Sequence, residues 1–337
     1  MLISACQPII SRINRILYAA TKRVVSILIQ SLPLAIRDPF LRRAAVLPPL
    51  IKTVSFERLC TRMSRDYIDP ERLMNTNLGV SRAIRCCIPL RKSQYVFGKP
   101  SNNVSERATL ALVKELSKDC RHFLDVGAHE GIYTFSVFAT RGTDIVLHWF
   151  EPDKILADRF SHNLEQNKII AWGNRVAVAH RSGSTTFFRN LSDDLSGSIS
   201  PYFKSKHTTQ PEMVNTLNLS DYFRERQISR ALVKVDVEGA GSEVWLGLEN
   251  TFKTLTYLII EMLEPEITTS LPSKIIDQTG WYAYYIRDIE LVEATNGEFE
   301  YVEPFWNWLF CELNPGSLAR RLRGSPFRVI TAPRASD

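Results

Sequence analysis

The chain has 337 residues, of which 45% are hydrophobic and 23% charged. These proportions are those of a globular protein with a buried core, and they exclude a disordered or collagen-like chain. The net charge of +6 is unevenly spread, because residues 1–100 carry 17 Lys and Arg against 5 Asp and Glu, whereas residues 101–317 carry 20 against 30. We therefore expect an acidic body with basic flanks.

The first 100 residues are predicted to form a basic N-terminal extension. Apolar residues recur with helical spacing over residues 9–34, but basic residues interrupt them too often for a spanning helix. The pattern predicts a basic amphipathic helix, which either makes peripheral contact with the inner face of a membrane or packs against protein. Both alternatives stay open. A proline-rich linker follows the helix, at Pro33, Pro39, Pro48 and Pro49.

The cysteines indicate a reducing compartment. None of the six belongs to a C-x-x-C pair, so the spacing indicates neither a disulfide framework nor a zinc site. Free thiols in a cytoplasmic protein are the simpler interpretation.

From about residue 101 the pattern changes to short apolar runs alternating with helical stretches. Such alternation predicts βαβ units, and so an α/β fold with a doubly wound, mostly parallel, Rossmann-like sheet. Two later runs, at 281–287 and 306–313, predict a C-terminal antiparallel hairpin. We assign residues 101–315 to one domain and residues 316–337 to a flexible basic tail. The expected parallel strands lie at 122–126, 145–150, 176–179, 231–237 and 257–261.

The first motif with chemical meaning is Leu124-Asp125-Val126-Gly127-Ala128-His129-Glu130-Gly131. It predicts a strand, a glycine turn and a helix, and Gly127 allows the backbone to approach a ligand closely. A dinucleotide fold favours G-x-G-x-x-G for its pyrophosphate. The spacing here is D-x-G-x-x-x-G, which suits a cofactor that presents an ammonium group. An ordinary strand-to-helix turn is the alternative.

The second motif is Trp149-Phe150-Glu151-Pro152-Asp153, at the end of the next expected strand. A carboxylate at this place can accept hydrogen bonds from both hydroxyls of a ribose. We therefore interpret Glu151 as a cofactor ligand rather than as a helix cap.

The third motif, Val233-Lys234-Val235-Asp236-Val237-Glu238-Gly239, places Asp236 and Glu238 at the carboxyl end of a central strand. Transfer of a group to a hydroxyl requires a base that receives the hydroxyl proton, and either carboxylate can serve. The alternative is that both cap the following helix. Glu261 ends another strand, so the three acids could bind Mg²⁺. We expect a metal-free acidic site.

Taken together, LDVGAHEG, FEPD, NLEQN, SGS, TLNLSDYF and VKVDVEG resemble the FkbM family of methyltransferases over about 200 residues. The resemblance implies a class I methyltransferase fold, S-adenosylmethionine as cofactor, and O-methylation of a hydroxyl on a sugar, glycolipid or other secondary metabolite. By position it implies that Asp236 and Glu238 line the acceptor side. The residues that it implies for cofactor binding are Asp125, Gly127, His129, Gly131 and Glu151.

Three departures from the family pattern stand at His129, Asn218 and Gly241, where the family often has Asn, Asp and Glu. His129 and Gly241 support one alternative to the methyltransferase, a degenerate methyltransferase-fold scaffold. A second alternative is a nicotinamide-dependent oxidoreductase on a related sheet, and the missing pyrophosphate fingerprint counts against it. We expect a small-molecule or glycan acceptor. We expect no nucleic-acid partner, since the body is acidic. The segment from about Ser192 to Asn215 is expected to shape the acceptor site.

Overall fold

The computed structural model describes residues 73–77, 85–89, 104–191, 196–248, 251–268, 270–294 and 306–331. The chain divides into two compact units. One comprises residues 1–79 and 86–99, and the other comprises residues 80–85 and 100–337. Strands β1 (Leu73–Asn77) and β2 (Arg85–Pro89) pair in a small sheet of their own. The expected amphipathic helix at 9–34 and the proline-rich linker lie outside the described residues.

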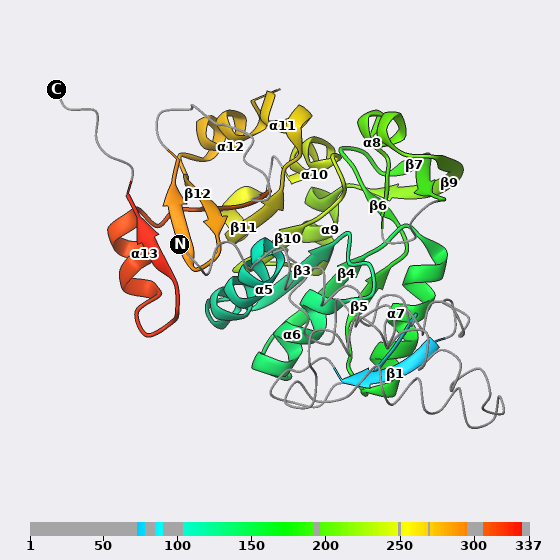
Figure 1. Ribbon diagram of the computed structural model, residues 1–337, viewed down its shortest axis with the longest axis horizontal. Coiled ribbons are helices and arrows are strands. Elements are labelled where there is room, and N and C mark those ends of the chain that lie inside the picture. The colour runs from blue at the N-terminus through cyan, green and yellow to red at the C-terminus, as the bar shows by residue number, and fades with distance from the viewer. Residues whose placement is uncertain are drawn as a thin grey trace, which may run out of the picture. The chain divides into compact units, whose positions relative to one another are not determined.

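The larger unit is built on a nine-stranded sheet with the order β15-β13-β12-β14-β11-β10-β3-β4-β5 (Figure 1). The five strands from β11 to β5 are parallel, whereas β14 is antiparallel to both β11 and β12. This is the predicted doubly wound sheet, with its antiparallel strands at the C-terminal end. The strands are β3 (His122–Val126), β4 (Val146–Phe150), β5 (Trp172–Asn174), β10 (Ala231–Val235), β11 (Leu255–Glu261), β12 (Tyr282–Arg287), β13 (Glu290–Glu293), β14 (Asn307–Cys311) and β15 (Arg328–Ile330).

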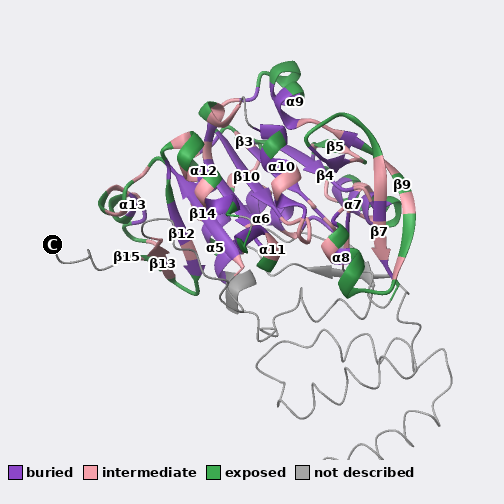
Figure 2. Ribbon diagram, turned by 90° about the horizontal axis from the view of Figure 1, so that it is seen from above, coloured by how far each residue is buried: buried purple, intermediate pink, exposed green. Residues whose placement is uncertain are grey.

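Helices cover both faces of this sheet because the connecting segments are amphipathic (Figure 2). Their buried residues pack on the strands, and exposed residues gather on their outer sides. The helices are α5 (Val104–Leu116), α6 (Ile132–Arg141), α7 (Lys154–Gln166), α8 (Pro201–Lys206), α9 (Leu219–Arg226), α10 (Gly241–Leu248), α11 (Glu264–Thr268), α12 (Leu271–Thr279) and α13 (Pro315–Arg321). Single 3₁₀ turns lie at Ser117–Asp119 and Phe252–Thr254.

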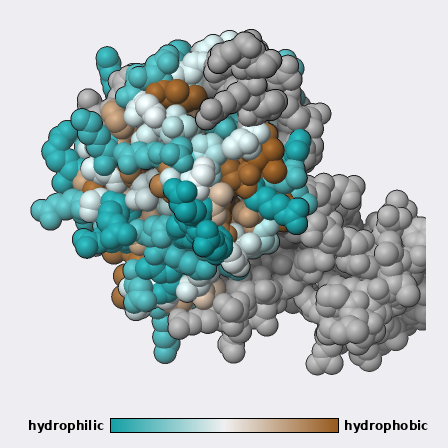
Figure 3. All heavy atoms as spheres, turned by 90° about the vertical axis from the view of Figure 1, so that its left-hand side faces the viewer, coloured by the Kyte–Doolittle hydropathy of each residue, from teal (hydrophilic) through white to brown (hydrophobic). Residues whose placement is uncertain are grey.

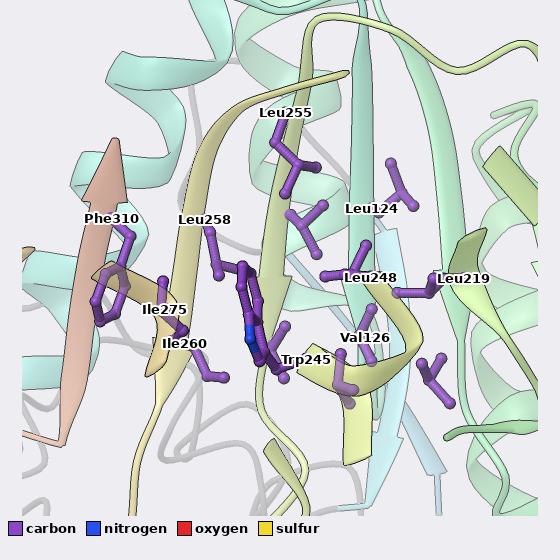
Figure 4. Close-up of a cluster of buried hydrophobic side chains, with 14 of the residues drawn as sticks. Leu124, Val126, Leu219, Trp245, Leu248, Leu255, Leu258, Ile260, Ile275 and Phe310 are labelled. Carbon is purple, nitrogen blue, oxygen red and sulfur yellow. The ribbon is translucent and has the colours of Figure 1, made fainter. Parts of the chain in front are cut away.

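One hydrophobic cluster fills the space between the sheet and helices α9, α10 and α12 (Figure 4). Alternate strand residues point into it, among them Leu124, Val126 and Ile260, and Trp245 of α10 packs against them. The intervening residues of the same strands therefore face α5 and α6 on the other side, as the period of two requires. Lys234 of β10 and Asp125 of β3 belong to this second set.

The sequence-based strand at 176–179 is real but lies in a different sheet. Ala177 and Val178 form β6, which joins a four-stranded sheet with the order β6-β9-β7-β8. The edge of the main sheet is instead β5, whose residues are partly exposed and so lack the apolar run of a buried strand. The other strands of the small sheet are β7 (Gly183–Asn190), β8 (Gly197–Ser198) and β9 (Thr209–Leu217).

The predicted flexible tail after residue 315 is wrong as far as residue 331. Helix α13 is followed by β15, which extends the main sheet beside β13. Arg321 anchors α13 through ion pairs with Glu115 and Asp119, so its charge serves the fold instead of a basic tail. Residues 332–337 lie outside the described part.

Hydrophobic residues form small, separate patches among hydrophilic ones on the face shown in Figure 3. Within the described ranges, no helix has both the length and the apolar character needed to cross a membrane.

Candidate active site

The candidate residues gather where four neighbouring parallel strands end. Strands β4, β3, β10 and β11 lie side by side in that order, so their carboxyl ends form one edge of the sheet. Ligands of open α/β sheets bind at this edge. Glu151 follows β4, the turn 127–131 follows β3, Asp236 and Glu238 follow β10, and Glu261 ends β11. The structure thus places every sequence-predicted site residue at this edge or, for Asp125, one residue before the end of β3.

The turn after β3 packs directly against the end of β10. Gly127, His129 and Gly131 have φ of 76°, 52° and 85°. This left-handed region favours glycine, and glycine occupies two of the three positions. A Cβ atom at Gly127 would lie 1.8 Å from the backbone oxygen of Asp236. The predicted glycine turn therefore approaches the neighbouring strand so closely that a side chain at position 127 would clash with it.

Glu151 holds this turn in place. Its side chain is 5% exposed, and its Oε2 accepts a hydrogen bond from the His129 N–H at 2.8 Å. Its Oε1 accepts one from the Asp153 N–H at 2.9 Å. Burial raises the pKa of Glu151 to about 7. A carboxylate has about four acceptor directions, so each oxygen keeps capacity for a further donor such as a ribose hydroxyl.

Asp125 has a structural role that the sequence does not indicate. It is 1% exposed, and its Oδ2 accepts hydrogen bonds from the N–H and the hydroxyl of Thr134, at 3.0 and 2.6 Å. Thr134 lies in the first turn of α6, so Asp125 ties that helix to β3. Burial raises the pKa of Asp125 to about 7. A direct contact with a cofactor ammonium stays a prediction.

Lys234 is a site residue that the sequence analysis did not single out. It is completely buried, and its Nζ donates to Asp236 Oδ2 at 3.2 Å and to the Val235 carbonyl at 3.1 Å. The ammonium also lies 5.1 Å from the centre of the Tyr133 ring. The available signal was a lysine inside an apolar strand, because a lysine is almost never fully buried without a partner.

The three strand-end carboxylates differ in their protonation. Burial opposes the ionisation of Asp236, but the Lys234 ammonium and a hydrogen bond with Glu261 hold the pKa of Asp236 below its usual range. Burial and the repulsion of Asp236 and Glu238 raise the pKa of Glu261 well above its usual range. The pair therefore favours an ionised Asp236 beside a protonated Glu261.

Gly241, one of the departures from the FkbM pattern, has a local explanation. A Cβ atom there would lie 2.6 Å from Glu266 Oε1. Glu266 is 3% exposed, and its carboxylate accepts hydrogen bonds from the N–H groups of Gly241, Ser242 and Leu263. Glu266 thus supplies an acidic group at the start of α10 that the family pattern places at position 241 itself.

The segment expected to shape the acceptor site does reach this edge. Ser198 of β8 donates a hydrogen bond from its hydroxyl to the Val237 carbonyl at 2.7 Å. A Cβ atom at Gly239 would lie 3.5 Å from the Ser200 hydroxyl and 3.6 Å from the Tyr202 ring. The start of α8 therefore packs beside Gly239. Residues 192–195 of the segment lie outside the described part.

Residues 125–278 match the family model of the methyltransferase FkbM domain. Residues 125–278 are therefore similar to an FkbM methyltransferase domain. The match begins at Asp125 and includes every predicted site residue, which confirms the resemblance drawn from the motifs. This part of the chain has the class I methyltransferase fold that was expected, with β14 inserted antiparallel between β11 and β12. S-adenosylmethionine, the cofactor expected with the FkbM resemblance, is consistent with this domain and fold.

Several solved methyltransferase structures are similar to the chain at low identity. The N-terminal domain of human METTL16 is 11% identical, over 82% of this chain and 90% of that one, with a TM-score of 0.39. TrmK of M. capricolum, solved in complex with S-adenosylhomocysteine, is 10% identical, over 60% of this chain and 66% of that one, with a TM-score of 0.35. A putative caffeoyl-CoA O-methyltransferase from Staphylococcus aureus is 9% identical, over 66% of this chain and 95% of that one, with a TM-score of 0.35. No curated protein matches the sequence.

Proposed function

We propose that this chain is an S-adenosylmethionine-dependent O-methyltransferase whose acceptor is a hydroxyl on a sugar, glycolipid or secondary metabolite. The observation that supports the proposal most is the order of groups along the sheet edge. The glycine turn and Glu151 lie after β3 and β4, and the acids Asp236 and Glu238 follow the adjacent strand β10. A cofactor subsite and an acceptor subsite are thus neighbours, as in-line transfer requires.

Each group at the sheet edge has its own role in the proposed reaction. Glu151 holds the ribose, and the turn from Gly127 to Gly131 brings its backbone against the cofactor. S-adenosylmethionine, when bound, supplies a methyl group on a positively charged sulfur. Asp236, ionised beside Lys234, accepts a hydrogen bond from the acceptor hydroxyl and receives its proton as the new bond forms. Glu238, whose carboxylate lies close to that of Asp236, is the second group that can receive the proton.

Two further expectations belong to this proposal. Cys120 and Cys311 are both free and buried, which fits a reducing compartment, and we propose a cytoplasmic location. Residues 9–34 are proposed to make peripheral membrane contact. The acceptor is proposed to be a small molecule or glycan and not a nucleic acid, since residues 101–317 carry a net negative charge.

The proposal is tested by titrating the full chain with S-adenosylhomocysteine in a calorimeter. We expect saturable one-site binding, weakened by about tenfold or more in Glu151→Gln, because a buried charge-assisted hydrogen bond contributes about 1.5–3 kcal/mol. Glu165→Gln, on α7 away from the sheet edge, is the matched control.

Labelled S-adenosylmethionine is then offered with a panel of hydroxylated acceptors. Asp236→Asn combined with Glu238→Gln should abolish turnover and preserve cofactor binding, and unchanged turnover would show that neither is the base. Absence of binding to the folded wild type would favour the degenerate scaffold.

A further inference from the structure

Three carboxylates from two adjacent strands converge at the acceptor end of the site. Asp236, Glu238 and Glu261 each present an oxygen, and these oxygens lie within 4.8 Å of one another. The three side chains are partly exposed, so an ion from solvent can reach them. Acidic clusters of this kind are common without any ligand, and the cluster alone decides nothing.

A buried amide beside the cluster is the second observation. Asn307 of β14 lies directly opposite Glu261 of β11. The flanking pair is hydrogen-bonded, since the Met262 N–H donates to the Trp306 carbonyl at 2.8 Å. Glu261 and Asn307 therefore form a non-hydrogen-bonded antiparallel pair, in which side chains share one face and lie closest together.

The oxygen of this amide lacks a partner. Asn307 is 2% exposed, and its Oδ1 is buried with no hydrogen-bond donor. Leaving a buried polar atom without a hydrogen-bond partner costs about 1–3 kcal/mol. An atom of this kind in a native structure therefore indicates a bound ligand that satisfies it. The register directs Asn307 to the same face as Glu261, so a cation held by Glu261 lies within reach of the amide oxygen.

Charge and ligand chemistry point to a divalent ion. Three carboxylates carry three negative charges when ionised, and the Lys234 ammonium, 3.2 Å from Asp236, balances one. Two charges remain. All four donor atoms are oxygens, and carboxylate with amide oxygen is the ligand set of Mg²⁺, Mn²⁺ and Ca²⁺ rather than of zinc or copper.

We propose that Asp236, Glu238, Glu261 and Asn307 bind one divalent cation of the oxygen-preferring class. Ca²⁺ takes oxygens at about 2.3–2.6 Å and Mg²⁺ at about 2.0–2.1 Å, so oxygens within 4.8 Å of one another can reach one ion of either kind. At this edge the cation would lower the pKa of an acceptor hydroxyl, and Asp236 would still receive the proton. That role rests on the proposed function, but the binding itself does not.

The test is a titration of the chelator-treated full chain with Mn²⁺, followed by the electron paramagnetic resonance signal of the free ion. It needs neither cofactor nor acceptor. We expect one saturable site, with competition by Ca²⁺ and Mg²⁺. Loss of even an outer-shell partner costs about 10–100-fold in metal affinity, so Glu261→Gln should weaken Mn²⁺ binding by about tenfold or more. Asn307→Ala should weaken it by a smaller factor, and the exposed Glu264→Gln should leave it unchanged.

Each outcome decides the inference. No saturable binding of Mn²⁺, Mg²⁺ or Ca²⁺ overturns it, and so does equal affinity in the wild type, Glu261→Gln and Asn307→Ala. Should Glu261→Gln fail to fold, Asn307→Ala carries the test alone. Binding of S-adenosylhomocysteine without metal binding leaves the methyltransferase proposal standing and removes only the cation. Metal binding without S-adenosylhomocysteine binding leaves the cation site standing and removes the methyltransferase proposal.

Discussion

Lys234 influences the charge of the proposed acceptor side. It is the counter-ion of Asp236, and it comes from the second-to-last residue of β10, on the face that also carries Asp125. An ammonium with no solvent contact is costly unless its partners are well placed, and here a carboxylate and a carbonyl accept from it. Asp236 therefore depends on a residue that never reaches the surface.

Replacing this ammonium should cost stability as well as chemistry. We expect Lys234→Met to lower the free energy of unfolding by about 3 kcal/mol, because removing one partner of a buried pair leaves the other charge uncompensated. All six tryptophans lie between positions 149 and 308, so tryptophan fluorescence during denaturant unfolding reports on this unit in the full chain. The exposed Lys253→Met is the control. Adding Asp236→Asn to Lys234→Met should restore part of the loss, and a double variant no more stable than the single one would contradict the pairing.

At the residue scale the sequence predicts the acids but not their partners. Asp125, Glu151, Asp236 and Glu238 were found because strand ends in an alternating pattern must meet at one sheet edge. Their partners Thr134, Lys234 and Glu266 are set by packing between distant segments. Asn307 was hidden for the same reason, since only the antiparallel register of β14 places it beside Glu261.

The glycine turn is the element on which the two halves of the site meet. It follows β3, receives the Glu151 carboxylate at His129, and contacts the backbone of Asp236 at Gly127. A change in this turn therefore alters the cofactor side and the acceptor side together.

Gly127→Ala tests this dependence. The φ of 76° alone costs an alanine about 1–2 kcal/mol. The added Cβ would also lie 1.8 Å from the Asp236 backbone oxygen, which cannot rotate away. Gly280→Ala is the matched control, with a φ of 70° and no atom within 4 Å of the added Cβ. We expect Gly127→Ala to lose at least about 2 kcal/mol more than Gly280→Ala in denaturant unfolding, and to weaken S-adenosylhomocysteine binding. Equal losses would show that the backbone can relax around the turn.

At the element scale the buried parallel strands were predictable and the edges were not. Strands β3, β4, β10 and β11 are buried and mostly apolar, as strands covered on both faces are expected to be. The edge strand β5 has mostly exposed side chains and no such run, so the sequence predicts the apolar segment at 176–179 in its place. The antiparallel strands β7 and β9 of the small sheet also have few buried side chains, so their alternation is weak.

The whole unit holds more buried carboxyls with raised pKa than buried imidazoles with lowered pKa. Burial raises the pKa of Asp125 and Glu151 to about 7 and that of Glu266 to about 6, and it raises the pKa of Glu261 well above its usual range. Burial acts in the opposite direction on His148, whose pKa it lowers to about 3, and it lowers the pKa of His122. The folded state therefore binds more protons than the unfolded chain across the neutral range.

Stability should fall as the pH rises from 5 to 7.5. An acidic group whose pKa is higher in the folded protein than in the unfolded chain stabilises the folded state fully when the pH is below the unfolded pKa. This contribution is lost as the pH rises through the folded pKa. For Asp125 the loss over this range is about 2–3 kcal/mol. His148 contributes in the opposite sense only up to its unfolded pKa near 6.5. Denaturant unfolding at several pH values, followed by tryptophan fluorescence, measures the slope. Asp125→Asn should flatten it, whereas the exposed Asp144→Asn should not. If the stability of the wild type rose through this interval, these carboxyls would be ionised in the folded protein. Bound cations or water would then have to stabilise their negative charge.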